Sequence, residues 1–304
     1  MRGEIFENFA VLDLNRDLER GGFGQKKGKK IFLHPIEALY LQLNGKANFG
    51  SLEDVIEWVQ RKVENFPEIY FVYEDLRRRG KKVKLKDDLI FTRKAFLPIS
   101  ESDKIIFEKI KNILLKFKEV VLAIVDEERE VTYYSVREPE MQGEQRENLQ
   151  KFRGIIFSDR VITEDLEVFR KYFYGSEICG FVVLSLLESV YFLEKGVLEV
   201  ENADKILQTA KKINGFEKKL QVYRDLKKRK FVVKTGFKFG NDFRVYRKVE
   251  SLKELPHSEF LISVVEDRID PKELSRAIRI ANSVRKKLIL AWNCNYFIFE
   301  WVKI

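Results

Sequence analysis

The sequence contains few of the side chains that metal and redox sites use. Its 304 residues include only two histidines and two cysteines. Cys179 and Cys294 are far apart in the sequence, so they form neither a disulfide framework nor a metal-binding pattern. The sequence also lacks a glycine-rich phosphate loop, a zinc-type ligand spacing, a Ser/His/Asp signature and a clear cluster of carboxylates. We therefore expect a protein that needs no cofactor and no metal ion.

Long apolar runs are missing as well. The longest ones, such as residues 181–187, are far too short to cross a bilayer. The N-terminus is charged and does not resemble a signal peptide. At the same time, 45% of the residues are hydrophobic and 25 are phenylalanine, which is ample material for buried cores. We expect a cytoplasmic protein that does not associate with a membrane.

The two halves of the chain resemble each other. Residues 72–84 match residues 222–234 at an offset of 150, and residues 33–46 match residues 184–197 at an offset of 151. Two blocks in nearly the same register, a domain's length apart, indicate a tandem duplication. One repeated helix has apolar residues at positions i, i+4, i+7 and i+10, which predicts one buried face. These residues are Phe66, Tyr70, Tyr73 and Leu76 in the first copy and Phe216, Leu220, Tyr223 and Leu226 in the second.

Positive charge is concentrated in the second half. Residues 1–150 contain 27 basic and 27 acidic side chains, whereas residues 151–304 contain 30 and 21 and carry the whole net charge of +9. Residues 201–250 alone contain 15 basic and 6 acidic side chains. Localised positive charge beside aromatic side chains favours a phosphate-bearing partner, through Coulomb attraction and counterion release. A solvated, lysine-rich helix face is the alternative explanation.

Three residues of the second half suit the cleavage of RNA without a metal. Tyr246 lies in a strand-like run, His257 follows that run, and Lys286 lies at the end of a basic helix. Attack by the neighbouring 2′-hydroxyl needs a proton acceptor, a proton donor for the departing 5′-oxygen and positive charge near the transition state. An ordinary imidazole, with a pKa of about 6.5, suits the acid role of His257. An ordinary phenol, at about 10, needs a nearby ammonium such as Lys286 to favour the phenolate.

The same stretch resembles the catalytic domain of archaeal tRNA-splicing endonucleases. The resemblance rests on "VVKTGFKFGNDFRVYRK" (232–248), "LPHSEFLI" (255–262) and "RAIRIANSVRKKL" (276–288), where "HS" follows the tyrosine after eleven residues and "VRK" ends a helix. The two-copy layout is similar to the homodimeric branch, whose first repeat has lost catalysis. This resemblance implies an enzyme that cuts precursor tRNA at bulge-helix-bulge sites without metal and leaves a 2′,3′-cyclic phosphate and a 5′-hydroxyl.

The resemblance also implies an α+β fold. Each repeat is expected to have a small, helix-rich N-terminal α/β subdomain followed by a mixed-sheet subdomain similar to the tRNA-endonuclease catalytic domain. The expected boundaries are residues 1–86 and 87–140 for the first repeat, 141–157 for a linker, and 158–233 and 234–304 for the second repeat.

Individual roles follow from the same resemblance. Tyr246 matches the general base, His257 the general acid, and Lys286 the electrostatic stabiliser, with Lys287 adjacent to it. Arg279 matches an arginine that stacks on a bulged base. Trp301 stands where a second such arginine is expected, so that it either stacks on a base or packs in the core or the dimer seam.

The acidic turn formed by Asp126, Glu127 and Glu128 resembles the family's docking loop, which inserts into a basic pocket on another subunit. Complementary charge of this kind favours register and association rate. A solvated hairpin turn is the alternative. The expected partners are therefore precursor tRNA, or another bulge-helix-bulge RNA, and a second copy of the chain.

Other polar residues are interpreted as structural. His34 begins a repeated helix in which the second copy has Ser185. Asp225 and Lys227 have an acidic and a basic counterpart in the first copy, so a solvated helix face explains them. Two rival functions stay open: a non-catalytic RNA-binding or assembly subunit, and a metal-dependent DNA nuclease of related fold.

Overall fold

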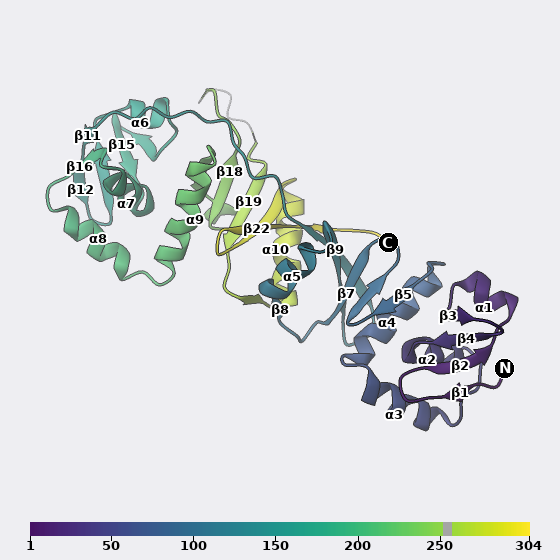
Figure 1. Cartoon of the computed structure of the whole chain (residues 1–304). Helices are drawn as coiled ribbons and strands as arrows, with labels where there is room; N and C mark the ends of the chain where they lie inside the picture. The colour runs from purple at the N-terminus through teal and green to yellow at the C-terminus, as the bar shows by residue number, and fades with distance from the viewer. Residues whose placement is uncertain (252–256) are drawn as a thin grey trace. The chain divides into compact units, whose positions relative to one another are not determined.

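The computed structural model describes residues 1–251 and 257–304 (Figure 1). The chain is a mixed α/β protein that divides into two compact units, which are described separately. The first unit comprises Met1–Arg137, Arg268–Ser275 and Glu300–Ile304, and the second comprises Glu138–Asp267 and Arg276–Phe299. Among the described residues, no helix is both long and apolar enough to cross a membrane.

The first unit begins with a small antiparallel sheet covered by helices. Helix α2 packs against β4 and also contacts α3 and α4. Apolar side chains of these helices and of the sheet form one buried core. The sheet has the order β1-β2-β4-β3, and its elements are β1 (Glu4–Ile5), β2 (Ala10–Asp13), α1 (Arg16–Gly21), β3 (Gln25–Lys27), β4 (Lys30–Leu33), α2 (Pro35–Leu43), α3 (Leu52–Lys62) and α4 (Phe66–Arg78).

A mixed sheet follows, with strand order β10-β9-β7-β6-β5. Strands β7 and β9 are parallel and are connected through α5, whereas the other neighbouring strands are antiparallel. Helix α4 packs on this sheet. The elements are β5 (Lys84–Lys86), β6 (Leu89–Phe91), β7 (Ala95–Ser100), β8 (Ile105–Ile106), α5 (Phe107–Leu114), β9 (Glu119–Val125) and β10 (Val131–Arg137), and β8 pairs with β20 (Arg268–Ile269).

The second unit repeats this order of elements. Its small sheet has the order β12-β13-β15-β14, α7 packs on that sheet, and α9 packs on the mixed sheet. Its first part consists of β11 (Phe152–Arg153), β12 (Ile155–Phe157), β13 (Arg160–Thr163), α6 (Glu167–Arg170), β14 (Ser176–Ile178), β15 (Phe181–Leu184), α7 (Leu186–Lys195), β16 (Leu198–Glu199), α8 (Ala203–Lys211) and α9 (Phe216–Lys228).

The mixed sheet of the second unit has the order β17-β18-β19-β21-β22. Parallel strands β19 and β21 are connected through α10. The elements are β17 (Val232–Thr235), η1 (Phe237–Phe239), β18 (Phe243–Tyr246), β19 (Phe260–Val264), α10 (Pro271–Ser283), β21 (Lys287–Trp292) and β22 (Asn295–Trp301).

Strand pairing gives a residue-by-residue correspondence between the two mixed sheets. Ala95 pairs with Phe91 on one side and Val120 on the other, just as Leu261 pairs with Arg244 and Leu288. The same register places two tyrosines at matching positions: Tyr133 pairs with Ala123, and Tyr296 pairs with Ala291.

The repeated helix face predicted from the sequence is confirmed. Tyr73 and Leu76 on α4 are fully buried, and Tyr223 and Leu226 on α9 are at most 2% exposed. The first position of the pattern differs slightly between the copies, since Phe66 is half-buried and Phe216 is 9% exposed. The period of the apolar residues was therefore sufficient to predict which side of each helix enters the core.

The prediction of a solvated face for Asp225 and Lys227 was wrong. The Lys227 side chain is 2% exposed and forms an ion pair with Glu147. The Asp225 carboxylate accepts a hydrogen bond of 2.7 Å from Tyr296. The pattern misled because a charged residue can occupy the buried side of a helix when a partner from another segment meets it there.

The segment expected to be a linker, residues 141–157, is ordered along the second unit. Gly143 donates to the backbone of Arg229, and Glu147 reaches Lys227. Residues 152–157 form β11 and β12, so they are part of the second unit's sheets. The sequence-based boundaries remain a prediction.

Candidate active site

Tyr246 is the last residue of β18. Side chains alternate along a strand, so Val245 enters the main core while Tyr246 lies on the opposite face of the sheet. The residue is 7% exposed, and close packing therefore fixes the direction of the ring. It packs in a small separate cluster with Phe173, Val232 and Val249.

His257 lies just before β19, at the end of the sheet where β18 finishes. The residue itself is exposed, whereas the next residue, Ser258, is buried. Arg247, which follows Tyr246, donates a hydrogen bond of 2.8 Å to the carboxylate of Glu259. This ion pair ties the end of β18 to the chain beside His257.

Lys286 lies just before β21 and is positioned by the end of helix α10. The basic helix expected to extend to Lys286 ends at Ser283. Arg285 adopts a left-handed conformation with φ 54°, its N–H donates to Asn282, and the N–H of Lys286 donates to Ala281. These two bonds form a Schellman motif, which turns the chain from the helix into the strand. Lys286 thus leaves the helix axis and can reach across the sheet end.

The Lys286 ammonium reaches the segment that carries His257. Its Nζ donates a hydrogen bond of 3.0 Å to the carbonyl oxygen of Ser258 and lies 5.6 Å from the centre of the Phe239 ring. Because β19 and β21 are parallel neighbours, the starts of both strands lie at the same end of the sheet. The structure therefore brings the chain segments of Tyr246, His257 and Lys286 together at one end of this sheet.

Arg244 is a second cation at this site, which the sequence reasoning missed. It lies two residues before Tyr246 and so faces the same side of β18. Its Nε is buried and, among the described residues, has no hydrogen-bond partner. Burial first, and then the charge of Arg244, lower the pKa of Lys286. The alternation of side chains along the strand could have identified Arg244 from the sequence, because it places Arg244 on the same face as Tyr246.

The first unit differs at this site in a specific way. Counting along the paired strands puts Arg93 at the position of Tyr246 and Lys118 at that of Lys286. The connection that corresponds to the one between β18 and β19, which carries His257, consists only of residues 92–94, between β6 and β7. The first unit thus has a lysine counterpart but lacks both the tyrosine and the length of chain that carries the histidine.

The other candidate residues lie at the surface of their units. Arg279 is exposed on α10, and Trp301, at the end of β22, is 57% exposed, so packing of Trp301 in the core of the chain is ruled out. In the acidic turn, the Asp126 carboxylate accepts bonds from the N–H groups of Glu128 and Glu130. Asp126 therefore shapes the turn, while Glu127 and Glu128 are exposed.

No metal-binding cluster was found among residues 1–251 and 257–304, where no group of three or more His, Cys, Asp and Glu side chains is placed to share an ion.

Comparison with known proteins connects this site to a family. The family model described as tRNA intron endonuclease, catalytic C-terminal domain, matches residues 216–295, and the model of the N-terminal domain matches twice, at residues 10–50 and 152–211. A protein named tRNA-splicing endonuclease from Methanococcoides burtonii is 34% identical over 96% of this chain and 95% of its own length. The chain belongs to the tRNA-splicing endonuclease family.

Other relatives in the tRNA-splicing endonuclease family agree over most of their length. The protein of that name from Methanosarcina mazei is 34% identical over 89% of this chain and 88% of its own. The one from Natronomonas pharaonis is 30% identical over 100% of this chain and 98% of its own. The match to the catalytic domain covers Tyr246, His257 and Lys286. The difference between one catalytic match and two N-terminal matches parallels the different site residues of the two units.

Proposed function

We propose that the chain is a tRNA-intron endonuclease that cuts precursor tRNA at bulge-helix-bulge sites in the cytoplasm without a metal ion. The observation that supports this most strongly is the contact between Lys286 Nζ and the carbonyl oxygen of Ser258. It holds a cation beside the exposed His257, at the sheet end where β18 finishes with Tyr246.

The proposed reaction is an attack by the 2′-hydroxyl on the adjacent phosphorus. Tyr246 accepts the hydroxyl proton, the O2′–P bond forms and the P–O5′ bond breaks, while His257 gives a proton to the departing 5′-oxygen. The products are a 2′,3′-cyclic phosphate and a 5′-hydroxyl. Lys286 and Arg244 supply positive charge near the phosphorane-like transition state. The lowered pKa of Lys286 also means that this ammonium gives up a proton more readily than a solvated lysine.

The proposal extends to the whole assembly. The two units are tandem copies, each with the subdomain layout expected from the sequence, and the first has lost catalysis. Two chains form a homodimer in which the acidic turn of one chain docks on the second unit of its partner, so that two active sites act on the two bulges. Arg279 and Trp301, both exposed, are proposed to stack on bulged bases.

Cleavage of a labelled bulge-helix-bulge RNA in excess EDTA tests the reaction. We expect the wild type to make two cuts with cyclic-phosphate ends, and His257→Ala to bind the RNA but to lose cleavage by a factor of at least about 10², the usual contribution of a positioned acid. His34→Ala, which changes the other histidine, is the control and should cut at the wild-type rate. Failure of the folded wild type to cut a verified substrate would favour the non-catalytic RNA-binding subunit instead.

A further inference from the structure

The hairpin loop between β17 and β18 presents an unusually exposed aromatic ring. Phe237, in the short helix η1, is 87% exposed, the largest exposed fraction among the large hydrophobic side chains of the described residues. A phenylalanine in water contributes nothing to the hydrophobic free energy of folding. Its neighbour Lys238 is also exposed.

The loop is held rigidly although Phe237 itself is not packed. The N–H groups of Phe239 and Asn241 both donate to the carbonyl of Gly236, and Gly240 donates to Phe237. A Cβ atom at Gly236 would lie 2.8 Å from the carbonyl oxygen of Asn241, so this turn requires glycine there. The backbone is therefore fixed by its own hydrogen bonds, and the ring of Phe237 is held in the solvent by a defined turn.

Two polar side chains, one buried and one partly buried, anchor the same loop to β19. Asn241, 8% exposed, donates to the carbonyl of Phe239 at 2.7 Å and accepts from the Ser263 hydroxyl at 2.9 Å. Asp242 accepts from the N–H of Val264 at 2.8 Å and pairs with Lys219 at 2.6 Å. Because these contacts hold the backbone of the loop in one conformation, the ring loses little conformational freedom when it binds a ligand.

The loop lies beside the proposed active site. The ring of Phe239, two residues from Phe237, lies 5.6 Å from Nζ of Lys286. The corresponding connection in the first unit is shorter. At equivalent positions of the two sheets, Leu85 pairs with Ile90 in the first unit, and Thr235 pairs with Phe243 in the second. The short turn contains two aspartates, Asp87 and Asp88. The longer, aromatic loop thus accompanies the unit that carries the tyrosine and the histidine.

We propose that Phe237 is a stacking platform for an unpaired base of the RNA next to the cleaved phosphate. This inference rests on the proposed function. An exposed ring on a rigid backbone offers a flat apolar face to which any nucleobase can stack, and the neighbouring Lys238 provides a charge for the phosphate chain. The platform adds to Arg279 and Trp301 a contact from the loop between β17 and β18.

Affinity for RNA is the direct test, measured in a His257→Ala background so that the RNA stays intact. The probe is a bulge-helix-bulge RNA, compared with a fully paired duplex of the same length. We expect the additional change Phe237→Ala to weaken binding of the bulged RNA about tenfold, the range that loss of one stacked base gives, and to leave binding of the duplex nearly unchanged. Phe237→Trp should preserve the affinity, and Phe237→Leu should lose it, because leucine is apolar but has no ring face.

A matched control uses Phe157, which is 62% exposed on the small sheet of the second unit. Phe157→Ala should leave the affinity unchanged. Placing 2-aminopurine at each bulge position reports stacking directly, since its fluorescence should rise in the Phe237→Ala complex at one position. Equal affinity of the alanine variant for the bulged RNA, or an equal loss for both RNAs, would overturn the platform. These outcomes are separate from the proposed function, which fails only if the protein with wild-type His257 does not cut.

Discussion

His34 illustrates how one side chain can serve the same structural role as a different residue in the other unit. Its Nδ1 accepts a hydrogen bond of 3.2 Å from the N–H of Ile36 at the start of α2, and Glu37 completes the capping box. In the second unit Ser185 and Glu188 form the same box at the start of α7. A histidine that accepts through its ring must be neutral, and burial lowers the pKa of His34 to about 4.

This cap makes the stability of the first unit depend on pH. The pKa of His34 is lower in the folded protein than the ordinary value of 6.5, so the unfolded chain binds the proton more tightly. The contribution of the neutral His34 to the free energy of unfolding is therefore fully present above pH 6.5. It decreases as the pH drops towards 4, by up to about 3 kcal/mol. We expect His34→Ser, which installs the cap of the second unit, to remove this part of the pH dependence. Denaturant unfolding at pH 4 and pH 7 measures this pH dependence. If the wild type and His34→Ser lost the same stability between pH 7 and pH 4, His34 would not be its source.

The candidate catalytic residues show what can be predicted at the level of single residues. Spacing and family resemblance identified Tyr246, His257 and Lys286 as candidates, and the structure brings their segments to one end of a sheet. The conformation that positions Lys286 could not be predicted, because Arg285 occupies a left-handed conformation that the sequence would assign to glycine or asparagine. The environment of Arg244 could not be predicted either, since burial of its Nε depends on how the surrounding segments fold.

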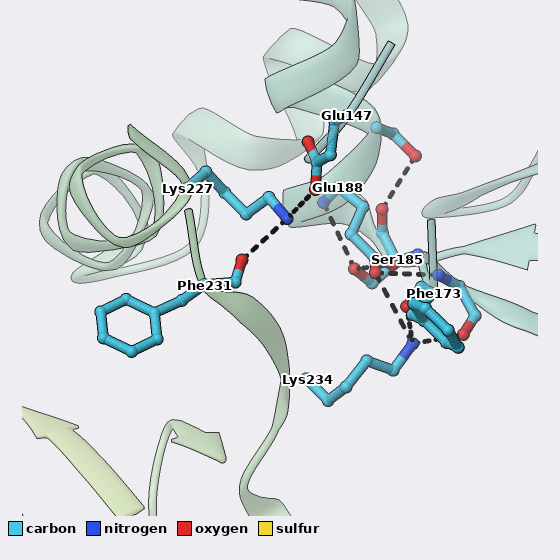
Figure 2. A network of polar contacts seen from close by, with 9 residues as sticks. Glu147, Phe173, Ser185, Glu188, Lys227, Phe231 and Lys234 are labelled. Carbon is cyan, nitrogen blue, oxygen red and sulfur yellow. Dashed lines mark hydrogen bonds and ion pairs between the residues drawn. The ribbon is translucent and has the colours of Figure 1, made fainter. Parts of the chain in front are cut away.

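At the level of elements, an ion pair between the buried Lys227 and the partly buried Glu147 joins the chain before β11 to helix α9. Figure 2 shows Lys227 reaching the carboxylate of Glu147 and the carbonyl oxygen of Phe231. Tyr174 donates to the other carboxylate oxygen of Glu147 at 2.7 Å. Lys234 donates to the carbonyls of Phe173 and Gly175 in the same network. Desolvation lowers the pKa of Lys227, and the negative charge of Glu147 counteracts this effect.

Removal of the lysine from this network should be costly. We expect Lys227→Met to lower the free energy of unfolding of the second unit by about 3 kcal/mol, because the partly buried carboxylate of Glu147 then loses its buried cation. The neighbour Lys228 is exposed on the same helix, so Lys228→Met should change stability by less than about 0.5 kcal/mol. Urea unfolding of the three proteins measures the difference. The further change Glu147→Gln in the Lys227→Met protein should restore part of the loss, and a full loss in the double variant would contradict this explanation.

The helices were more predictable than the connections between strands. Apolar periodicity predicted the buried faces of α4 and α9 because a helix repeats the same geometry along its length. The β17–β18 loop depends instead on a glycine in close contact with other backbone atoms and on Asn241 reaching Ser263. Such contacts join residues that are distant in sequence, so a local pattern cannot predict them.

For the whole molecule, the main feature is that the two units share specific contacts. Both units have a capping box on the helix after the small sheet. In both, a tyrosine also donates a hydrogen bond to an aspartate on the following long helix. The distance is 2.6 Å from Tyr133 to Asp75 and 2.7 Å from Tyr296 to Asp225. The sequence predicted this repetition through its two offsets. The differences between the units lie in connections at the ends of the strands, where changes of length do not disturb the cores.

One of these differences gives a prediction about assembly. The turn between β9 and β10 contains the exposed Glu127 and Glu128, whereas the turn between β21 and β22 has only Asn293 and Cys294. If the acidic turn docks on a basic surface of a second copy, its charge should speed and orient association. We expect Glu127→Gln with Glu128→Gln to raise the dimer dissociation constant about tenfold at low salt, with a smaller effect at high salt because ions screen the attraction.

Sedimentation equilibrium at two salt concentrations measures the dissociation constant. The control, Glu4→Gln with Glu53→Gln, removes the same charge from exposed positions elsewhere in the first unit, and it should leave the constant unchanged. Asp126 is kept in both proteins because its carboxylate holds the turn through the N–H groups of Glu128 and Glu130. A salt-dependent loss confined to the turn variant, together with slower RNA cleavage at low protein concentration, would tie dimerisation and activity to these two side chains. An unchanged dimer would instead leave the acidic turn as a solvated hairpin.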